Sequence, residues 1–398
     1  MNKRKIEMST VVFDRLPEHD TCWAFIEGTD GKLYTGVCGE ITGGLSAYVA
    51  GYDPLSGKMD YLIEMASAVG HPADNGEATH SKVHKSLLQD VDGTIYAATH
   101  CTGAPEGDWL WRPWNCWNHP RKFFCGAGLA VMKPSGELIY SKIILNKEGS
   151  RCMALAPGRR KIYGMSYPKN HFFIYDLKTR ETRDLGRLGN INPQAVFTDA
   201  AENGYTTDDF GKIIRYDADK DRLEDTGLQI PHVSWRNGYH NTLYDIVCDP
   251  EENRVWGVTW TWGQRLFSLD FDTMKLTDYG PALEEADQWS HIIHTHVGGM
   301  VFGSDRKLYF TANRQTPEGS HPVLVRFDPE SAERTVLGPL AVNGIPADHI
   351  ARGALGSDGC LYFSEAGNTP TKLFRCDLGF KSKPKFKTIV SGGNNDPS

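Results

Sequence analysis

The sequence predicts an all-β protein, a seven-bladed β-propeller whose blades are four-stranded antiparallel sheets. Three features of the 398 residues predict this fold. A short apolar strand, a turn that often contains Asp-Gly and an apolar–aromatic pair recur seven times. Most copies are followed by a third strand and a charged turn, and four short strands per unit of about 40–50 residues are typical of propellers. The 41 glycines and 16 tyrosines, with few long Ala- or Leu-rich runs, also favour β structure.

Each copy contains one aromatic residue that we expect in the second strand of its blade. Asp-Gly and Asp-Pro turns between alternating strands are typical of hairpins, so the segment before each aromatic residue should be the inner strand. Third strands are expected in "FFIYDLKTRE", "KIIRYDADKD", "LFSLDFDTMK", "VLVRFDPESAE" and "KLFRCDL". In chain order the anchor aromatic residues are Tyr34, Tyr96, Tyr163, Tyr205, Trp256, Tyr309 and Tyr362.

The seven units occupy nearly the whole chain, which predicts a single domain over residues 1–398. A terminal strand should close the ring, either "TVVFDRL" or "FKTIV". Two stacked β-sandwich domains are the alternative, but they do not explain why the same strand–turn–strand segment occurs seven times. Residues 101–126 are expected to form a long aromatic loop after the second strand of the second blade. Most of its tryptophans should pack in a small core of their own, with one or two rings facing a substrate.

Composition and charge exclude several classes of protein. The formal net charge of −7 argues against a nucleic-acid binder, and no run of about 18 apolar residues predicts a membrane span. The nine cysteines are scattered, which favours reduced thiols. No apolar segment follows the basic N-terminus, so we expect a cytoplasmic protein; a secreted or periplasmic one is the alternative if a signal was trimmed.

A metal site is not predicted. Cys101, Cys116 and Cys125, with His100 and His119 nearby, could in principle gather a zinc ion. Their spacing fits no compact ligand pattern, so neither a metal nor another cofactor is expected from these residues.

Alignment of the seven copies on their aromatic residues places two positions at one mouth of the channel. These positions lie twelve residues before the anchor and four after it. The second copy has His84 and His100 there, and the third has Arg151 and Tyr167. Histidine and tyrosine transfer protons, and arginine binds a carboxylate through two parallel hydrogen bonds. Because β-elimination from a uronic acid needs these roles together, we expect the four to be catalytic. A histidine bonded only within its blade is the structural alternative for His84.

More polar and aromatic residues fall near the same mouth. Together they predict a cationic and aromatic funnel suited to an acidic sugar. The predicted substrate-binding residues are His80, Gln194, Arg236, Tyr239, His240, Trp260, His294, His296, Arg314 and Arg352.

The histidine pair in "HSKVHKSLLQDVDGTIYAATH", followed by an Arg/Tyr pair in the next blade, resembles the propeller polysaccharide lyases. These include ulvan lyases and L-rhamnose-α-1,4-D-glucuronate lyases, and α-L-rhamnosidases form a related propeller group. The propeller architecture is shared over all seven blades, whereas the specific motifs lie within residues 79–101 and 150–168. It implies that His84 and His100 handle the proton, that Arg151 neutralises the uronate carboxylate and that Tyr167 is an acid or base. The wider histidine spacing of ulvan lyases would suit His80 with His100.

The resemblance therefore implies a carbohydrate lyase that cleaves a rhamnose–glucuronate type linkage and leaves a 4,5-unsaturated uronate. Its partner would be an acidic oligosaccharide or polysaccharide containing glucuronate and rhamnose. The alternatives are an α-L-rhamnosidase acting on the same linkage and a non-catalytic glycan-binding propeller. The rhamnosidases use a histidine on the opposite face. The presence of both histidines, the arginine and the tyrosine on this face therefore favours elimination. Some members of the family hold a structural metal, and a metal bridging the carboxylate is a further alternative.

Overall fold

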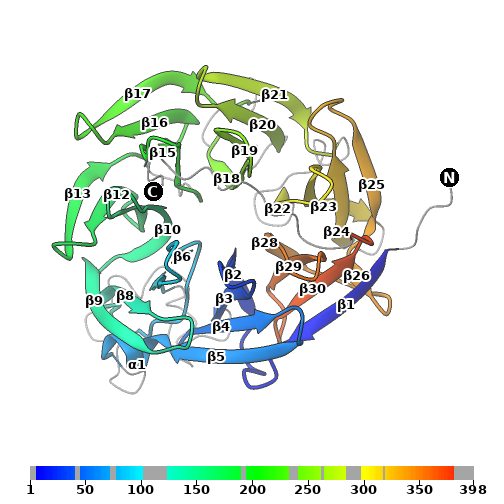
Figure 1. Ribbon diagram of the computed structural model, residues 1–398, viewed down its shortest axis with the longest axis horizontal. Coiled ribbons are helices and arrows are strands. Elements are labelled where there is room, and N and C mark those ends of the chain that lie inside the picture. The colour runs from blue at the N-terminus through cyan, green and yellow to red at the C-terminus, as the bar shows by residue number, and fades with distance from the viewer. Residues whose placement is uncertain are drawn as a thin grey trace, which may run out of the picture.

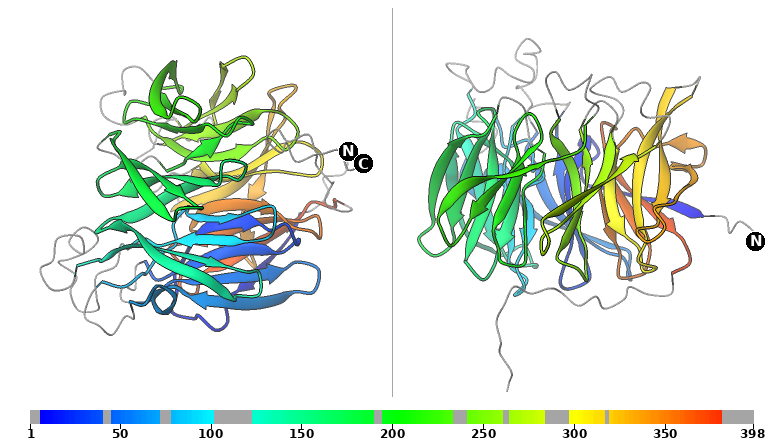
Figure 2. Two further views of the ribbon diagram at one scale, coloured as in Figure 1. Left: turned by 60° about the vertical axis from the view of Figure 1, so that its left-hand side comes forward. Right: turned by 90° about the horizontal axis from the view of Figure 1, so that it is seen from above.

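A computed structural model describes residues 6–40, 45–71, 78–101, 123–189, 194–232, 241–260, 264–283, 297–316 and 319–380. The described strands are arranged in small sheets around a ring (Figure 1). Seen from above, the strands run roughly along the axis of the ring, and the connecting segments gather at its two faces (Figure 2). The all-β prediction is confirmed.

Five antiparallel sheets contain four strands each, and neighbouring strands follow one another in the chain. We name them blades 2 to 6. Blade 2 is β6 (Leu87–Gln89), β7 (Ile95–Ala98), β8 (Gly126–Met132) and β9 (Leu138–Asn146). Blade 3 is β10 (Gly149–Ala156), β11 (Lys161–Tyr167), β12 (His171–Asp176) and β13 (Glu181–Arg187). Blade 4 is β14 (Phe197–Thr198), β15 (Gly204–Thr207), β16 (Lys212–Asp217) and β17 (Arg222–Gln229). Blade 5 is β18 (Leu243–Cys248), β19 (Arg254–Thr259), β20 (Arg265–Asp270) and β21 (Lys275–Pro281). Blade 6 is β22 (Val297–Phe302), β23 (Leu308–Thr316), β24 (Gly319–Phe327) and β25 (Arg334–Pro339).

The remaining eight-stranded sheet combines two four-stranded units, which we name blades 1 and 7. Blade 1 is β2 (Thr21–Glu27), β3 (Leu33–Cys38), β4 (Tyr48–Asp53) and β5 (Lys58–Glu64). Blade 7 is β28 (His349–Leu355), β29 (Leu361–Ala366), β30 (Lys372–Asp377) and the N-terminal β1 (Glu7–Val12). A single residue pair, Thr21 with Ala366, joins the two units. The described strands are thus consistent with the seven predicted blades.

The closing strand comes from the N-terminus. β1 pairs with β30 in antiparallel register, from Glu7 opposite Asp377 to Val12 opposite Lys372 (Figure 1). This strand overlaps the first predicted candidate, "TVVFDRL", whereas "FKTIV" lies outside the described residues. The other described elements are the short helix α1 (Met65–Val69) after β5 and the small hairpin of β26 (Ala341–Val342) and β27 (Ile345–Pro346).

All seven anchor aromatic residues lie in the second strand of their blade and are almost fully buried. In four blades the anchor tyrosine hydroxyl donates to the aspartate of the preceding turn. The Oη–Oδ distance is 2.6 Å for Tyr34 with Asp30 and 2.9 Å for Tyr309 with Asp305. In these four blades the anchor therefore fixes its own hairpin, which explains why an aspartate before the aromatic residue recurs in the sequence. The other two pairs are Tyr205–Asp199 and Tyr362–Asp358.

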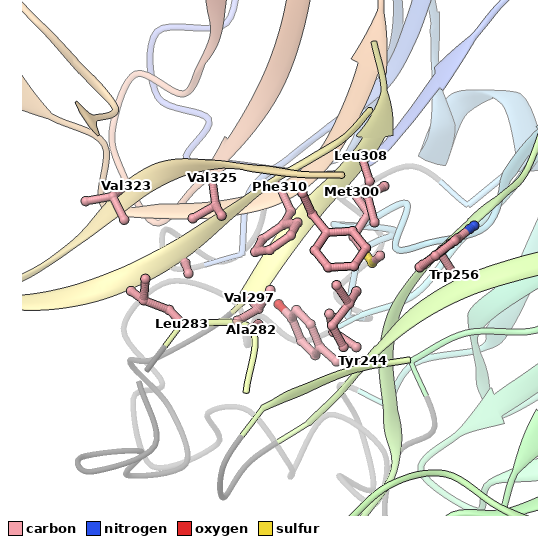
Figure 3. Close-up of a cluster of buried hydrophobic side chains, with 14 of the residues drawn as sticks. Tyr244, Trp256, Ala282, Leu283, Val297, Met300, Leu308, Phe310, Val323 and Val325 are labelled. Carbon is pink, nitrogen blue, oxygen red and sulfur yellow. The ribbon is translucent and has the colours of Figure 1, made fainter. Parts of the chain in front are cut away.

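The core lies between neighbouring blades. Figure 3 shows Tyr244 and Trp256 of blade 5 beside Leu308, Phe310 and other apolar side chains of blade 6. Each interface is built from two blades. Every blade of the ring is therefore packed on both sides against a neighbouring blade.

Replacing Tyr309 with phenylalanine is expected to lower the free energy of unfolding by about 1 kcal/mol. The change removes only the hydroxyl that donates to Asp305 at 2.9 Å and keeps the buried ring. Equilibrium urea unfolding measures the difference. Tyr48→Phe is the matched control, because the Tyr48 hydroxyl makes no hydrogen bond to a described residue. Equal stabilities of Tyr309→Phe and the unmodified protein would contradict the assigned role.

Candidate active site

β-bulges at the channel mouth place several side chains of the site. The register shifts in β2 between Thr21 and Ala24, in β10 around Arg151 and in β18 around Tyr244. A bulge redirects a side chain and is common beside functional sites. The bulges therefore explain why Trp23, Arg151 and Tyr244 lie at equivalent positions in three blades.

The four side chains predicted to be catalytic form one cluster. The ring centroids of His84 and His100 are 5.9 Å apart, and those of His100 and Tyr167 are 4.9 Å apart. Arg151 Nη1 lies 3.4 Å from His100 Nε2, and its guanidinium lies 5.5 Å from the centre of the Tyr167 ring. The spacing of the repeats therefore predicted correctly that these four side chains are neighbours. Their catalytic roles stay a prediction.

His84 is held as a neutral base. Its Nδ1 lies 2.7 Å from the backbone oxygen of Arg151, and because a carbonyl can only accept, Nδ1 carries the proton. Burial, together with the charges of Arg151 and Lys82, holds the pKa of His84 well below its ordinary value. Its buried Nε2 has no hydrogen-bond partner among the described residues. The lone pair of Nε2 is therefore available to accept a proton. The same three causes lower the pKa of His100.

The guanidinium of Arg151 lacks a carboxylate partner among the described residues. Its Nε is buried and makes no hydrogen bond to a residue that the structure describes. Burial lowers the pKa of Arg151, with Tyr167 and Glu40 acting in the opposite direction. A buried cation without a counterion is costly, so an anion that binds beside it gains a strong, charge-assisted interaction.

A second group of side chains supports His84 from blade 1. The indole of Trp23 stacks on the imidazole of His84, with ring centroids 5.0 Å apart and an interplanar angle of 24°. Trp23 Nε1 donates to Glu40, which also accepts from Lys82 Nζ at 2.5 Å. Although burial favours the protonated form, Lys82 keeps the pKa of Glu40 below its usual range. In blade 1 the position twelve residues before the anchor Tyr34 is Cys22, so the alignment by spacing missed Trp23, Glu40 and Lys82.

An ion network joins blades 2, 5 and 7 across the channel. Lys85 Nζ of blade 2 donates to the backbone oxygen of Tyr244 in blade 5 at 2.5 Å and lies 3.7 Å from Asp245. Arg352 of blade 7 donates to the same carboxylate. Burial lowers the pKa of Lys85 to about 7 although Asp245 favours its charged form. Arg352, which was expected to bind substrate, is thus engaged within the protein.

His80 lies in a different environment from His84. Its Nδ1 is 2.7 Å from Thr99 Oγ1 and its Nε2 is 3.5 Å from Cys125 Sγ. Its ring packs edge-on against Phe124, at a centroid distance of 5.2 Å. Because both ring nitrogens are engaged, the geometry favours His84 over His80 as the partner of His100.

The remaining predicted substrate-binding residues divide into two groups. Gln194 is buried, whereas Trp260 and Arg314 are partly buried, and the Trp260 ring lies 6.2 Å from that of Tyr244. The structure does not describe the others, namely Arg236, Tyr239, His240, His294 and His296, nor residues 102–122 of the aromatic loop.

The part of the chain that the structure describes contains no cluster of three or more His, Cys, Asp or Glu side chains able to hold a metal ion. Cys116 and His119 of the zinc set considered above fall outside that part. In the same residues no helix is long and apolar enough to cross a membrane.

The buried His80 is expected to make stability depend on pH. Burial lowers its pKa to about 3, whereas the unfolded chain keeps the ordinary value of 6.5. Between these values the unfolded chain binds a proton that the folded protein does not, so stability falls as the pH drops below 6.5. Between pH 6.5 and 5.5 the free energy of unfolding should fall by about 1 kcal/mol less in His80→Asn than in the unmodified protein.

Urea unfolding at the two pH values measures this difference. Asparagine keeps a polar group near Nδ1, within reach of Thr99. His171→Asn is the control, because His171 is partly exposed and its Nδ1 lies 2.7 Å from Asp184. The same pH dependence in His80→Asn and the unmodified protein would show that His80 is not the group responsible.

Comparison with known proteins supports the fold alone. No family model matches the chain, and no curated protein matches it. Among solved structures, virginiamycin B lyase from Staphylococcus aureus aligns with a TM-score of 0.60 and 10% identity, over 94% of this chain and 99% of that one. The β-propeller domain of Cps50 from Myceliophteria thermophila aligns with a TM-score of 0.56 and 10% identity, over 92% and 98%. At such identities these neighbours establish a β-propeller and leave the activity open.

Proposed function

We propose that the protein is a carbohydrate lyase that cleaves a rhamnose–glucuronate type linkage by β-elimination. One observation carries the proposal. The guanidinium of Arg151, without a carboxylate partner among the described residues, lies in the same cluster as the unpartnered Nε2 of the neutral His84. An anion-binding group and a base thus occur together at the mouth of the channel, as removal of a proton next to a carboxylate requires.

The chemistry follows from these two groups. The C5 proton of a uronate becomes acidic only when the adjacent carboxylate is neutralised, and Arg151 can bind that carboxylate through two parallel hydrogen bonds. His84 Nε2 then takes the proton while the C4–O bond breaks and the C4–C5 double bond forms. The leaving oxygen takes a proton from the hydroxyl of Tyr167. Arg151 also stabilises the charge that develops on the carboxylate. His100 and Tyr167, which contact each other and Arg151, complete the proton-transfer set.

Substrate binding would also change the pKa of His84. The positive charges of Arg151 and Lys82 contribute to the low pKa of His84. An anionic substrate placed beside Arg151 offsets these charges and raises the pKa of His84. The base therefore becomes stronger when the substrate is in place.

Two further observations support this choice. The sequence of the site resembles the propeller polysaccharide lyases in the order His, His, Arg, Tyr. One structural neighbour, virginiamycin B lyase, is named as a lyase, so the fold is compatible with this class of reaction. A cytoplasmic location, where imported oligosaccharides would be degraded, is part of the proposal.

The test is to incubate the protein with ulvan oligosaccharides and with gum arabic and to follow ultraviolet absorbance. A conjugated C4–C5 unsaturated uronate absorbs there, and the intact substrates do not. A rise in absorbance over a heat-unfolded blank supports the lyase. Release of rhamnose without this absorbance would instead indicate an α-L-rhamnosidase, and binding without any product would indicate a glycan-binding propeller.

A further inference from the structure

Trp23 of blade 1 lies flat against the imidazole of the proposed base, His84. The two ring centroids are 5.0 Å apart and the interplanar angle is 24°. Trp23 lies in the bulge of β2, where the register shifts between Thr21 and Ala24. A bulge redirects a side chain from the regular alternation of a strand. The local backbone of blade 1 therefore places the indole on the imidazole.

Two charged side chains hold the indole in place. Trp23 Nε1 donates to the carboxylate of Glu40, and Lys82 Nζ donates to the same carboxylate at 2.5 Å. Lys82 Nζ also lies 4.9 Å from the centre of the Trp23 ring, which is a cation–π distance, and its side chain is 1% exposed. The backbone N–H of Glu40 donates to Asp20 Oδ1 at 2.9 Å. Trp23, Glu40 and Lys82 thus contact one another, so each is held by the other two.

The contact with Trp23 complements the hydrogen bond that His84 makes. The Nδ1–H of His84 donates to the backbone oxygen of Arg151 at 2.7 Å, which fixes one edge of the ring. A single hydrogen bond still lets the ring tilt about the direction of that bond. The flat contact with the indole restricts this tilt. Because the lone pair of Nε2 lies in the plane of the ring, the indole also fixes the direction from which His84 can accept a proton.

We propose that Trp23 is the positioning residue of His84 and that its indole stabilises the imidazolium formed in the reaction. The inference rests on the proposed lyase function and adds a residue that acts through the base. When His84 Nε2 takes the C5 proton, the neutral imidazole becomes a cation that faces the electron-rich indole. After the product leaves, solvent takes this proton from His84 and returns one to Tyr167, which restores both side chains.

Charged and titratable groups from several elements surround the two rings. These groups are the same in the unmodified protein and in a Trp23 variant, so a difference in pH dependence between the two proteins reports the indole. They are Asp20 before β2, Glu40 after β3, Lys82 and Lys85 before β6, His100 after β7, Arg151 on β10 and His349 on β28.

The test measures kcat and KM of Trp23 variants on L-rhamnosyl-α-1,4-D-glucuronate, with the ultraviolet absorbance of the unsaturated product as the readout. Trp23→Leu removes the aromatic face. It should lower kcat by about 10- to 100-fold with little change in KM, because it disturbs the base rather than substrate binding. Trp23→Phe keeps a smaller aromatic face without the N–H and should lower kcat by about 3- to 10-fold. This second variant decides the question if Trp23→Leu does not fold.

The pH dependence of kcat gives an independent readout. The rate should rise with pH as His84 in the substrate complex loses its proton, so the acidic limb reports its pKa. Without the indole the imidazolium is less stable and the pKa of His84 falls. The limb should therefore move to a pH lower by about 0.5–1 in Trp23→Leu, and less far in the same direction in Trp23→Phe. A residue that only supports the fold would leave kcat of the folded protein and this limb unchanged, which would overturn the inference.

Two variants of Glu40 test its hold on the indole. Glu40→Gln and Glu40→Ala both remove the charge beside Lys82, but only glutamine keeps an oxygen that can accept from Trp23 Nε1. Glu40→Ala should therefore have a kcat about 3- to 10-fold below that of Glu40→Gln. Equal values would show that Glu40 does not anchor the indole.

Trp256→Phe is the matched control. The Trp256 ring stacks on that of Tyr279 at 5.1 Å and 26°, within the core between blades 5 and 6, so its loss should lower stability and leave kcat and the limb unchanged. Failure of the inference can be told apart from failure of the proposed function. If the unmodified protein forms no unsaturated product, the lyase function is wrong and the role of Trp23 falls with it. If it forms the product and both Trp23 variants keep its kcat, only the role of Trp23 is wrong.

Discussion

Replacing Asp245 with asparagine is expected to lower the free energy of unfolding by about 3–5 kcal/mol. The Asp245 carboxylate is 1% exposed and serves Lys85, Arg352 and the backbone N–H of Met300. Asparagine has the same shape but no charge, so two cations from different blades would face each other without a counterion. Equilibrium urea unfolding near pH 6 measures the loss.

The defect should shrink as the pH rises. The pKa of Lys85 is about 7 in the folded protein, and loss of Asp245 lowers it further. Above pH 7 Lys85 becomes neutral in both proteins, so its contribution to their difference disappears. The double variant Lys85→Met/Asp245→Asn should recover part of the stability, because only Arg352 then lacks a partner. A difference of less than about 1 kcal/mol for Asp245→Asn near pH 6 would contradict the assigned role of the network.

Replacing Arg151 with alanine is expected to lower kcat/KM of the proposed elimination by about 100- to 1,000-fold. The variant removes the guanidinium that we propose binds the uronate carboxylate and stabilises charge beside His84. Arg151→Lys should recover only part of the rate, because an ammonium cannot make two parallel hydrogen bonds to a carboxylate. Initial rates of ultraviolet absorbance increase measure the effect.

Two controls make this result specific. Arg183→Ala removes an arginine that pairs with Asp221 on the surface, and it should leave the rate unchanged. A substrate whose carboxylate is esterified carries no charge, so its slow elimination should depend much less on Arg151. If Arg151→Ala keeps the rate of the unmodified protein on the free acid, Arg151 does not neutralise the carboxylate.

The fold could be predicted from sequence because its repeating contacts are local. An anchor such as Tyr309 binds an aspartate only four residues before it, so the hairpin and its signature lie in one short segment. The closing strand was harder to predict, since the pairing of β1 with β30 joins the two ends of the chain and leaves no local pattern.

The site was predictable only in part, for the same reason. His84, His100, Arg151 and Tyr167 occupy equal offsets in adjacent blades, so a constant spacing found them. Contacts across the channel have no such spacing. Lys85 and Tyr244 are 159 residues apart, and nothing near Lys85 in the chain indicates its partner. The bulge in β2 displaces Trp23 from the aligned position, which a count of residues cannot detect.

The N-terminal strand affects the order in which parts of the protein can fold during synthesis. Residues 7–12 leave the ribosome before the other described strands, yet their pairing partners on β30 are among the last described residues to follow. Hairpins can form one by one during synthesis, but closing so long a loop is slow, because its entropy must be lost before the distant contacts form. The cross-channel contact of Lys85, Asp245 and Arg352 joins blades 2, 5 and 7 and cannot assemble before that stage. The ion network across the channel should therefore reach its final form only after blade 7 has been translated.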